Sequence, residues 1–171
     1  MQNRDTYINH SYRVEEVDNT DKAEELIDFL LSVHAFDAKL TPGEIEQIYR
    51  EPFICLRSRD LKYWFSRDEN GKIIAALGVK ETDHRTSGFL ISYIAVDKRH
   101  RHEGIGKQLL STALDFVKSM KGRFLMVDTS NRPEYEPMRT FMTTNGFVHV
   151  GTFPDYYYEG ESTMWFYYKI K

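Results

Sequence analysis

IAVDKRHRHEGIGKQLL, residues 94–110, is the most informative segment of this sequence. Its first three residues are the end of an almost wholly apolar run, FLISYIAV at residues 89–96, which predicts a central strand covered on both faces. A basic turn with two glycines follows, and after it an apolar stripe at helical spacing predicts a long helix. A buried strand that leads through such a turn into a helix N-terminus is typical of a phosphate-binding site. Unpaired amides and the positive end of the helix dipole both favour an anion there.

Two familiar nucleotide-binding motifs do not fit this turn. A P-loop needs glycine where Arg101 stands, and serine or threonine where Gln108 stands. A dinucleotide fingerprint needs a small residue where Leu109 stands. Gly104 and Gly106 nevertheless let the backbone approach a ligand closely. The phosphate ligand is therefore expected to be of another kind.

Residues 101–106, Arg-His-Glu-Gly-Ile-Gly, match the acyl-CoA signature Gln/Arg-x-x-Gly-x-Gly/Ala, and the chain resembles the GNAT superfamily of N-acetyltransferases. The run at residues 94–110 resembles that superfamily's strand, pyrophosphate turn and helix. Residues 129–147 (TSNRPEYEPMRTFMTTNGF) and 154–161 (PDYYYEGE) are similar to one bacterial branch of it. The resemblance covers nearly the whole chain and is weakest before Leu61.

The predicted fold is one α/β (α+β mixed) domain over residues 1–171. The resemblance implies the GNAT acyl-CoA N-acyltransferase fold, a central mixed, mostly antiparallel twisted sheet of about seven strands flanked by about four helices. Apolar periodicity predicts strands at residues 12–17, 61–66, 72–80, 89–96, 124–129, 147–153 and 164–170. Helices are expected at residues 21–34, from 42 to about 50 with a stop before Pro52, over the stretch that follows Gly106, and at residues 133–144.

Acetyl-CoA is the cosubstrate that the resemblance implies. Its pyrophosphate would be held by the backbone amides of the turn, which belong to Arg101, His102, Glu103, Gly104, Ile105, Gly106 and Lys107. Attack of an amine on the thioester makes an oxyanion, and the superfamily offers it a backbone N–H from a splayed, bulged central strand. Here that donor would lie near Ile94, Ala95 and Val96. The alternative is a solvated basic loop before an ordinary helix.

One position departs from the superfamily pattern. Met142 stands where a tyrosine commonly protonates the departing CoA thiolate, and a thioether cannot donate a proton. Tyr157, which aligns with a tyrosine of the bacterial branch, is the first substitute, and Tyr135 is a second. Tyr156 and Tyr158 are the other phenols nearby. The alternatives are protonation by water, a poor catalyst, and rings that only pack a hairpin or a dimer contact.

The remaining catalytic candidates lie on the two expected central strands. An alkyl ammonium has a pKa near 10, so it must lose a proton before it attacks, and Asp128 is a candidate base. Asp128 could instead only orient the turn after its strand. Ser92 is the one small hydroxyl in the apolar strand, and either it or Tyr93 is expected to face the acetyl group. Ser92 could instead bond a nearby carbonyl.

Composition excludes several other classes of function. The net charge of −3 gives no reason to expect nucleic-acid binding. The histidines and Cys55 lack the spacing of a metal site, and a lone cysteine among apolar residues is expected to be core, although it could carry an acyl group. No apolar run approaches the roughly 20 residues that cross a bilayer, and the first residues lack the apolar segment of a signal peptide. A cytoplasmic location without membrane association is expected, and the resemblance implies a homodimer.

Three hypotheses of function follow. The first is an N-acetyltransferase that moves the acetyl group of acetyl-CoA to a primary amine of a small molecule or peptide, by direct attack in a ternary complex. The second is an acyl-CoA-binding sensor with little turnover, which Met142 favours. The third is a structural, aromatic-rich dimer module. The acceptor is not determined, because its pocket is expected to be built mainly from the first two helices and the last hairpin, the least recognisable parts of the sequence. Asp155, Glu159 and Glu161 could attract a cationic amine or form a solvated loop.

Overall fold

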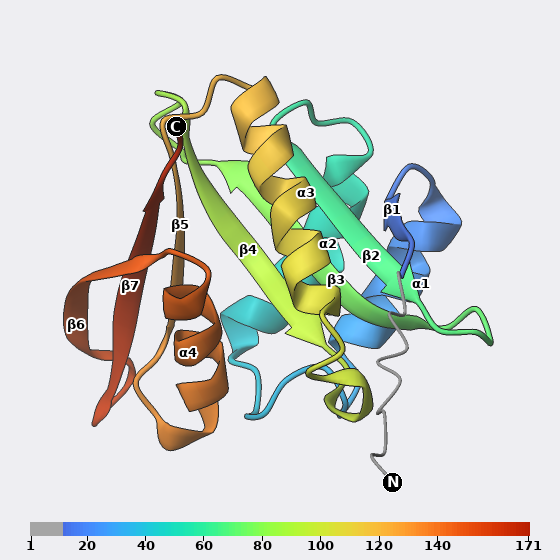
Figure 1. Cartoon of the computed structure of the whole chain (residues 1–171). Helices are drawn as coiled ribbons and strands as arrows, with labels where there is room; N and C mark the ends of the chain where they lie inside the picture. Colours follow the sequence, from blue (N-terminus) through green and yellow to red (C-terminus); the bar gives the residue numbers. More distant parts are fainter. Residues whose placement is uncertain (1–11) are drawn as a thin grey trace, which may run out of the picture.

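A computed structural model of the chain describes residues 12–171, which form a seven-stranded sheet with helices on both faces (Figure 1). The strands, in sheet order, are β1 (Val14–Glu16), β2 (Leu61–Arg67), β3 (Ile73–Glu81), β4 (Gly88–Val96), β5 (Phe124–Ser130), β7 (Glu161–Lys169) and β6 (Val148–Tyr158). Only β4 and β5 run parallel. The helices are α1 (Thr20–Leu30), α2 (Pro42–Cys55), α3 (Ile105–Ser119) and α4 (Glu136–Thr144), with short 3₁₀ helices η1 (Lys98–His100) and η2 (Pro133–Tyr135). The predicted mixed, mostly antiparallel sheet with four helices is confirmed.

Several element boundaries differ from the sequence prediction. The expected stop of the second helix before Pro52 is wrong, because α2 continues through Pro52 to Cys55. Ile48, Glu51, Pro52 and Cys55 are buried on one face, and their packing outweighs the hydrogen bond that proline removes. The first helix is shorter than predicted and ends at Leu30. Strand β6 is longer than predicted and takes in the three consecutive tyrosines.

The helices cover both faces of the sheet. In Figure 1, α3 and α4 lie on the near face and α1 and α2 on the far face. The core beside α3 contains Leu109, Leu110 and Val117 of that helix. The core beside α1 and α2 is built around Leu26 and Ile48. The sheet therefore has two apolar faces, as the wholly apolar central strand predicts.

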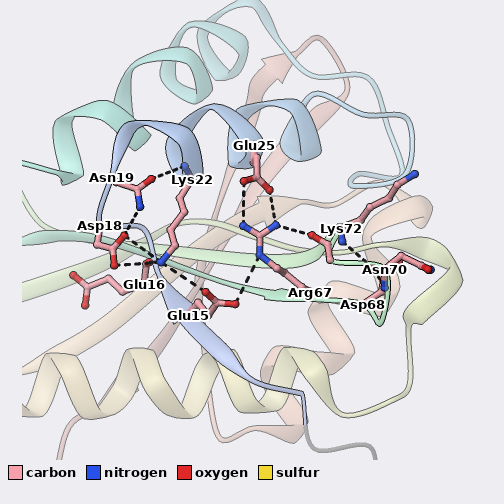
Figure 2. Close-up of polar contacts among 11 residues, drawn as sticks. Glu15, Glu16, Asp18, Asn19, Lys22, Glu25, Arg67, Asp68, Asn70 and Lys72 are labelled. Carbon is pink, nitrogen blue, oxygen red and sulfur yellow. Dashed lines mark hydrogen bonds and ion pairs between the residues drawn. The ribbon is translucent and has the colours of Figure 1, made fainter.

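A network of ion pairs on the surface joins α1 to the first two strands (Figure 2). Arg67 of β2 donates to Glu25 of α1 and lies 3.7 Å from a carboxylate oxygen of Glu15 in β1. Lys22 of α1 lies 3.1 Å from Asp18 and 3.7 Å from Glu15. Pairs this close to solvent contribute little each, so the network orients α1 more than it stabilises the fold.

Strand β4 carries a bulge at Ser92. Its pairing with β3 steps from Tyr93–Gly78 to Ile91–Val79, which leaves Ser92 as the extra residue. Ile91 consequently packs in the α3 core and Tyr93 in the α1–α2 core, although residues two apart in a regular strand share a face. The bulge thus turns the side chains of the strand's second half to the opposite face.

Strands β4 and β5 separate just before this bulge. Their parallel pairing covers only residues 88–90 with residues 124–126, although β4 continues to Val96 and β5 to Ser130. The second half of β4 therefore has no strand partner on its β5 side. Backbone groups on both sides of the gap are left to bond something other than a strand.

Glycine at position 78 lets a tyrosine cross the sheet close to the bulge. A Cβ on Gly78 would lie 2.2 Å from the ring of Tyr63, which is fully buried. The Tyr63 hydroxyl donates to Glu51 of α2 at 2.6 Å, and Lys80 of β3 donates to the same carboxylate at 2.7 Å. This buried cluster fixes α2 to the sheet beside the gap.

Replacing Gly78 with alanine is expected to destabilise the fold by about 1–3 kcal/mol, because the buried Tyr63 ring cannot move aside for the methyl group. Chemical denaturation followed by fluorescence measures the loss. Gly43→Ala is the matched control, since nothing lies within 4 Å of its Cβ position in the first turn of α2. It is expected to leave stability unchanged or raise it by up to about 1 kcal/mol. Equal stability of the two variants would contradict the role assigned to Gly78.

Candidate active site

One large cavity follows the gap between β4 and β5. Its volume of about 1650 Å³ exceeds that of a pocket for one drug-sized ligand, so it has room for two. It is lined by the second half of β4, the end of β5, the start of α3, the loop between α1 and α2, and parts of η2, α4, β6 and β7. The cavity therefore joins the basic turn to the elements expected to bind an acceptor.

The turn before α3 is shaped by Asp97 at the end of β4. Its side chain accepts a hydrogen bond from the Arg99 amide at 2.9 Å, and its second oxygen pairs with the Arg99 guanidinium at 2.7 Å. The side-chain hydrogen bond from Arg99 lowers the pKa of the nearly buried Asp97 carboxyl to about 2. His102 and Gly104 then adopt left-handed backbone conformations, with φ of 66° and 83°.

The amides of this turn are unpaired. Within residues 12–171, none of the seven main-chain N–H groups from Arg101 to Lys107 donates a hydrogen bond to protein. The first helical bond of α3 is made by the Gln108 amide, which donates to the Gly104 carbonyl at 3.2 Å. Every residue of the stretch except Glu103 lines the cavity. The arrangement can bind an anion with main-chain donors.

The side chain of Arg101 bonds to neighbouring parts of the protein. Its guanidinium lies 2.9 Å from Asp37 and its Nε donates to the Val96 carbonyl at 3.2 Å. The backbone amide of Lys98 also donates to the His34 carbonyl at 3.1 Å. These bonds attach the loop after α1 to the turn and close one wall of the cavity.

Strand β4 directs two further amides toward the gap. The Asp97 amide donates to the Ile74 carbonyl of β3 at 2.7 Å. Hydrogen-bonded and non-hydrogen-bonded pairs alternate along an antiparallel ladder, so the N–H groups of Val96 and Ile94 point away from β3. Both residues line the cavity, as does Ala95 between them.

The predicted catalytic candidates are brought together. Ser92, Asp128, Tyr135 and Tyr157 all line the cavity, although they come from four different elements. The Tyr157 hydroxyl donates to Asp128 at 2.7 Å, and Thr163 donates to the same oxygen at 3.3 Å. Burial, followed by the Asp128 charge, raises the pKa of Tyr157 far above its usual value.

Tyr135 is the second of the two phenols predicted to act in catalysis. Among the described residues its hydroxyl makes no hydrogen bond, and burial raises its pKa to about 12, with added contributions from Glu44, Glu161 and Asp37. Met142 is fully buried in the α3 core and does not line the cavity. Its neighbour Phe141 lines the cavity instead. Helix α4 therefore presents apolar side chains to this cavity.

Other residues singled out from the sequence take structural positions. Cys55 is 1% exposed in the α1–α2 core, and burial raises its pKa to about 11, so the core interpretation holds. Glu161 lines the cavity, whereas the Asp155 carboxylate accepts the Gly160 amide in the β6–β7 turn at 2.7 Å. In residues 12–171 no group of three or more His, Cys, Asp or Glu side chains is arranged to hold a metal ion. No helix of that same part has the length and apolar character to cross a membrane.

Sequence reasoning missed the buried Glu51–Tyr63 pair and the role of Glu44 in the cavity wall. A glutamate within an amphipathic helix gives no signal of burial by itself. Glu44 is recognisable from the sequence only as a helix cap, and in the structure it forms a capping box with Thr41.

A turn of unpaired amides beside splayed central strands is what the resemblance to the GNAT superfamily predicts, and the comparisons with known proteins agree. The model of the Acetyltransferase (GNAT) family matches residues 26–139, and the chain belongs to this family. No curated protein shows significant sequence similarity to the chain.

Solved structures show the same fold. A protein from Desulfovibrio desulfuricans assigned to the GNAT acetyltransferases has a TM-score of 0.79 at 18% identity, over 94% of this chain and 100% of its own. A GNAT acetyltransferase from Staphylococcus aureus Mu50 has a TM-score of 0.75 at 21% identity, over 94% and 100%. A protein from Bacillus anthracis str. Ames, assigned as a streptothricin acetyltransferase and solved with acetyl coenzyme A, has a TM-score of 0.62 at 21% identity, over 70% and 68%.

The Asp97 cap makes the stability of the turn depend on pH. Because folding lowers the pKa of Asp97 from 3.8 to about 2, its contribution is complete above about pH 4 and is lost as the pH falls through about 2. Asp97→Asn is expected to lower the free energy of unfolding at pH 7 by about 2 kcal/mol. Urea denaturation across this pH range measures the effect.

The control is Asp115→Asn, which changes an exposed carboxylate of α3 with no ion pair among the described residues. Its stability is expected to follow the wild-type pH curve, whereas the Asp97→Asn curve is flatter below pH 4. Parallel curves for all three proteins would refute the assigned role of Asp97.

Proposed function

We propose that this protein is an N-acetyltransferase that transfers the acetyl group of acetyl-CoA to a primary amine of a small molecule or peptide by direct attack in a ternary complex. The observation that carries the proposal is the run of unpaired amides from Arg101 to Lys107 at one end of the cavity. Unpaired main-chain donors are costly in a folded protein unless water or a ligand bonds them, and a pyrophosphate has the acceptor oxygens to do so. The Bacillus anthracis structure of this fold was solved with acetyl coenzyme A.

Acetyl-CoA supplies the activated acetyl thioester. The turn amides hold its pyrophosphate, and the gap between β4 and β5 receives its pantetheine arm beside Ile94, Ala95 and Val96. The N–H groups of Ile94 and Val96 face this gap, so either can donate to the thioester oxygen as negative charge develops on it. The backbone of the splayed strand thus both orients the thioester and stabilises the reaction.

Asp128 is the proposed base. It lines the cavity at the end of β5, and its described partners are hydroxyl groups rather than cations. Such a carboxylate can accept a proton from the acceptor ammonium, directly or through one water. Ser92 lies at the bulge, and its proposed role is to bond the amine that results.

Two phenols are proposed to assist the reaction, one at the base and one at the leaving thiolate. Tyr157 directs its proton to Asp128, so its first effect is to orient that base. Tyr135 has no described partner, and its pKa of about 12 keeps it protonated at any working pH. A phenol that weakly acidic stabilises a thiolate by donating a hydrogen bond more readily than by giving up its proton. Full turnover of a Tyr135→Phe variant would remove this role.

A second candidate function is an acyl-CoA sensor with little turnover. The observation that favours it is Met142, which leaves α4 without the usual phenol and is itself buried in the core.

Two further proposals do not bear on catalysis. They are a cytoplasmic location and a homodimer. The homodimer draws support from the edge strand β6, where Val148, Val150 and Phe153 are each at least 60% exposed.

CoA is expected to stabilise the protein against heat. At a CoA concentration 100 times the dissociation constant the gain is about 2.7 kcal/mol, or roughly 5–10 °C in the melting temperature. Gly104→Trp, which places an indole at the unpaired amides, is expected to abolish the gain. Gly71→Trp is the matched control, because Gly71 has a similar φ (79° against 83°), open space around its Cβ position, and no place in the cavity wall.

Release of free thiol from acetyl-CoA in the presence of an amine panel then separates the two functions. The enzyme is expected to release thiol in proportion to acetylated amine, and the sensor is expected to bind CoA without release. Unchanged melting temperatures with CoA would contradict both.

A further inference from the structure

The two ends of the cavity differ in charge. The end at the turn before α3 carries Arg101, Lys107 and two histidines. Four carboxylates line the rest of the cavity, those of Asp37, Glu44, Asp128 and Glu161. The basic end suits a phosphate-bearing cosubstrate.

Two of these carboxylates are neutralised by arginine. Asp37 lies 2.9 Å from Arg101, and Glu161 lies 3.7 Å from Arg132.

The other two have no cationic partner among the described residues. Glu44 accepts the Thr41 amide at 2.6 Å, and Asp128 accepts only hydroxyl groups. Of the lysines in the cavity wall, Lys80 is engaged by Glu51 at 2.7 Å and Lys39 is exposed. Two negative charges therefore remain uncompensated in the part of the cavity next to the β4 bulge.

The negative charges of Glu44 and Asp128 affect the pKa values of three phenols. Glu44 raises the pKa values of Tyr93, Tyr135 and Tyr157, after burial, which is the largest cause for each. Asp128 raises those of Tyr93 and Tyr157. The three rings come from β4, η2 and β6, so the potential extends across the space that these elements enclose.

Aromatic rings form much of the wall around that space. Phe36 packs edge-on against Tyr93, with ring centroids 5.9 Å apart, and Tyr156 packs edge-on against Tyr157 at 5.1 Å. Aromatic faces attract ammonium groups and pack against methylene chains. An apolar wall with two uncompensated carboxylates fits a flexible alkyl chain that carries positive charge.

Ser92 lines the cavity at the bulge. Its Oγ is enclosed and lies beside the Tyr63 hydroxyl, where it offsets part of the rise in that phenol's pKa. The carboxylates and the aromatic wall therefore carry the argument for a cationic ligand.

Resting on the proposed N-acetyltransferase function, we propose that the acceptor is an alkyl diamine or polyamine that binds as a di- or polycation. One nitrogen lies at the bulge between Ser92 and Asp128, and a second stays protonated against Glu44. The reacting ammonium gives one proton to Asp128. Its nitrogen then forms the bond to the acetyl carbon as the carbon–sulfur bond breaks. The second proton that this nitrogen loses passes to the departing thiolate, which leaves as the CoA thiol, and Asp128 returns the first proton to solvent. The product amide keeps the second ammonium and has lost one positive charge.

The first test is a binding measurement that does not depend on turnover. Cadaverine, a five-carbon diamine, and pentylamine, its monoamine analogue, are titrated by calorimetry into protein saturated with CoA. Cadaverine is expected to bind at least about fivefold more tightly, which is what one partly enclosed ion pair contributes. Equal binding of the two amines, or binding of neither, overturns the proposal.

The Glu44→Gln variant tests whether the second ammonium of the acceptor binds at Glu44. Glutamine keeps the capping box of α2, so the helix start is preserved. The variant is expected to lose the preference for cadaverine and to bind pentylamine as the wild type does. Glu46→Gln is the matched control on the same helix, because Glu46 is exposed, pairs with Arg50 and does not line this cavity. It is expected to keep the preference.

Turnover of both amines distinguishes the two proposals. If pentylamine is acetylated with the same KM as cadaverine, the N-acetyltransferase proposal stands and the dicationic acceptor is refuted. If cadaverine binds with the expected preference and neither amine is acetylated, the proposed enzyme function fails while the binding inference stands. If the Glu44→Gln variant binds both amines more weakly by the same factor, the assignment of the second ammonium to Glu44 is refuted.

Discussion

Main-chain N–H groups in a folded protein need acceptors, and here a contiguous part of the chain lacks them. Past Leu90, β4 has no strand on its β5 side, and beyond β4 the amides of residues 101–107 bond nothing in the described structure. The rest of the site depends on this lack of acceptors for the main-chain N–H groups. The bulge at Ser92, the left-handed residues of the turn and the Asp97 cap all keep these donors out of regular secondary structure. A ligand with acceptor oxygens along its length supplies what the backbone lacks.

The side chains around this backbone divide the cavity by charge. The loop after α1 is tied to the turn by Arg101 and Asp37, so the arginine side chain serves the architecture while the turn amides stay unpaired. At the other end, Asp128 and Glu44 are held by neutral donors and keep their charge available. The same fold thus offers donors to a phosphate and acceptors to an amine within one cavity.

Much of this could be predicted from the sequence, because the signals are local. The apolar strand, the glycines of the turn and the amphipathic helix indicated the position of the anion site, and the Thr41 capping box indicated the start of α2. Two kinds of feature could not be predicted. The continuation of α2 through Pro52 depends on tertiary burial that local propensity does not record. The bulge at Ser92, and the crossing of Tyr63 over Gly78 to Glu51, depend on the register of neighbouring strands.

The most direct measurement of the role of these unpaired amides is an NMR titration of isotope-labelled protein with CoA, followed by amide hydrogen exchange. We expect the amides of residues 101–107 to show the largest shifts and to exchange more slowly once CoA is bound, while amides of the β2–β3 turn at residues 68–72 do not change. CoA binding that leaves the amides of residues 101–107 unshifted and unprotected would contradict that role.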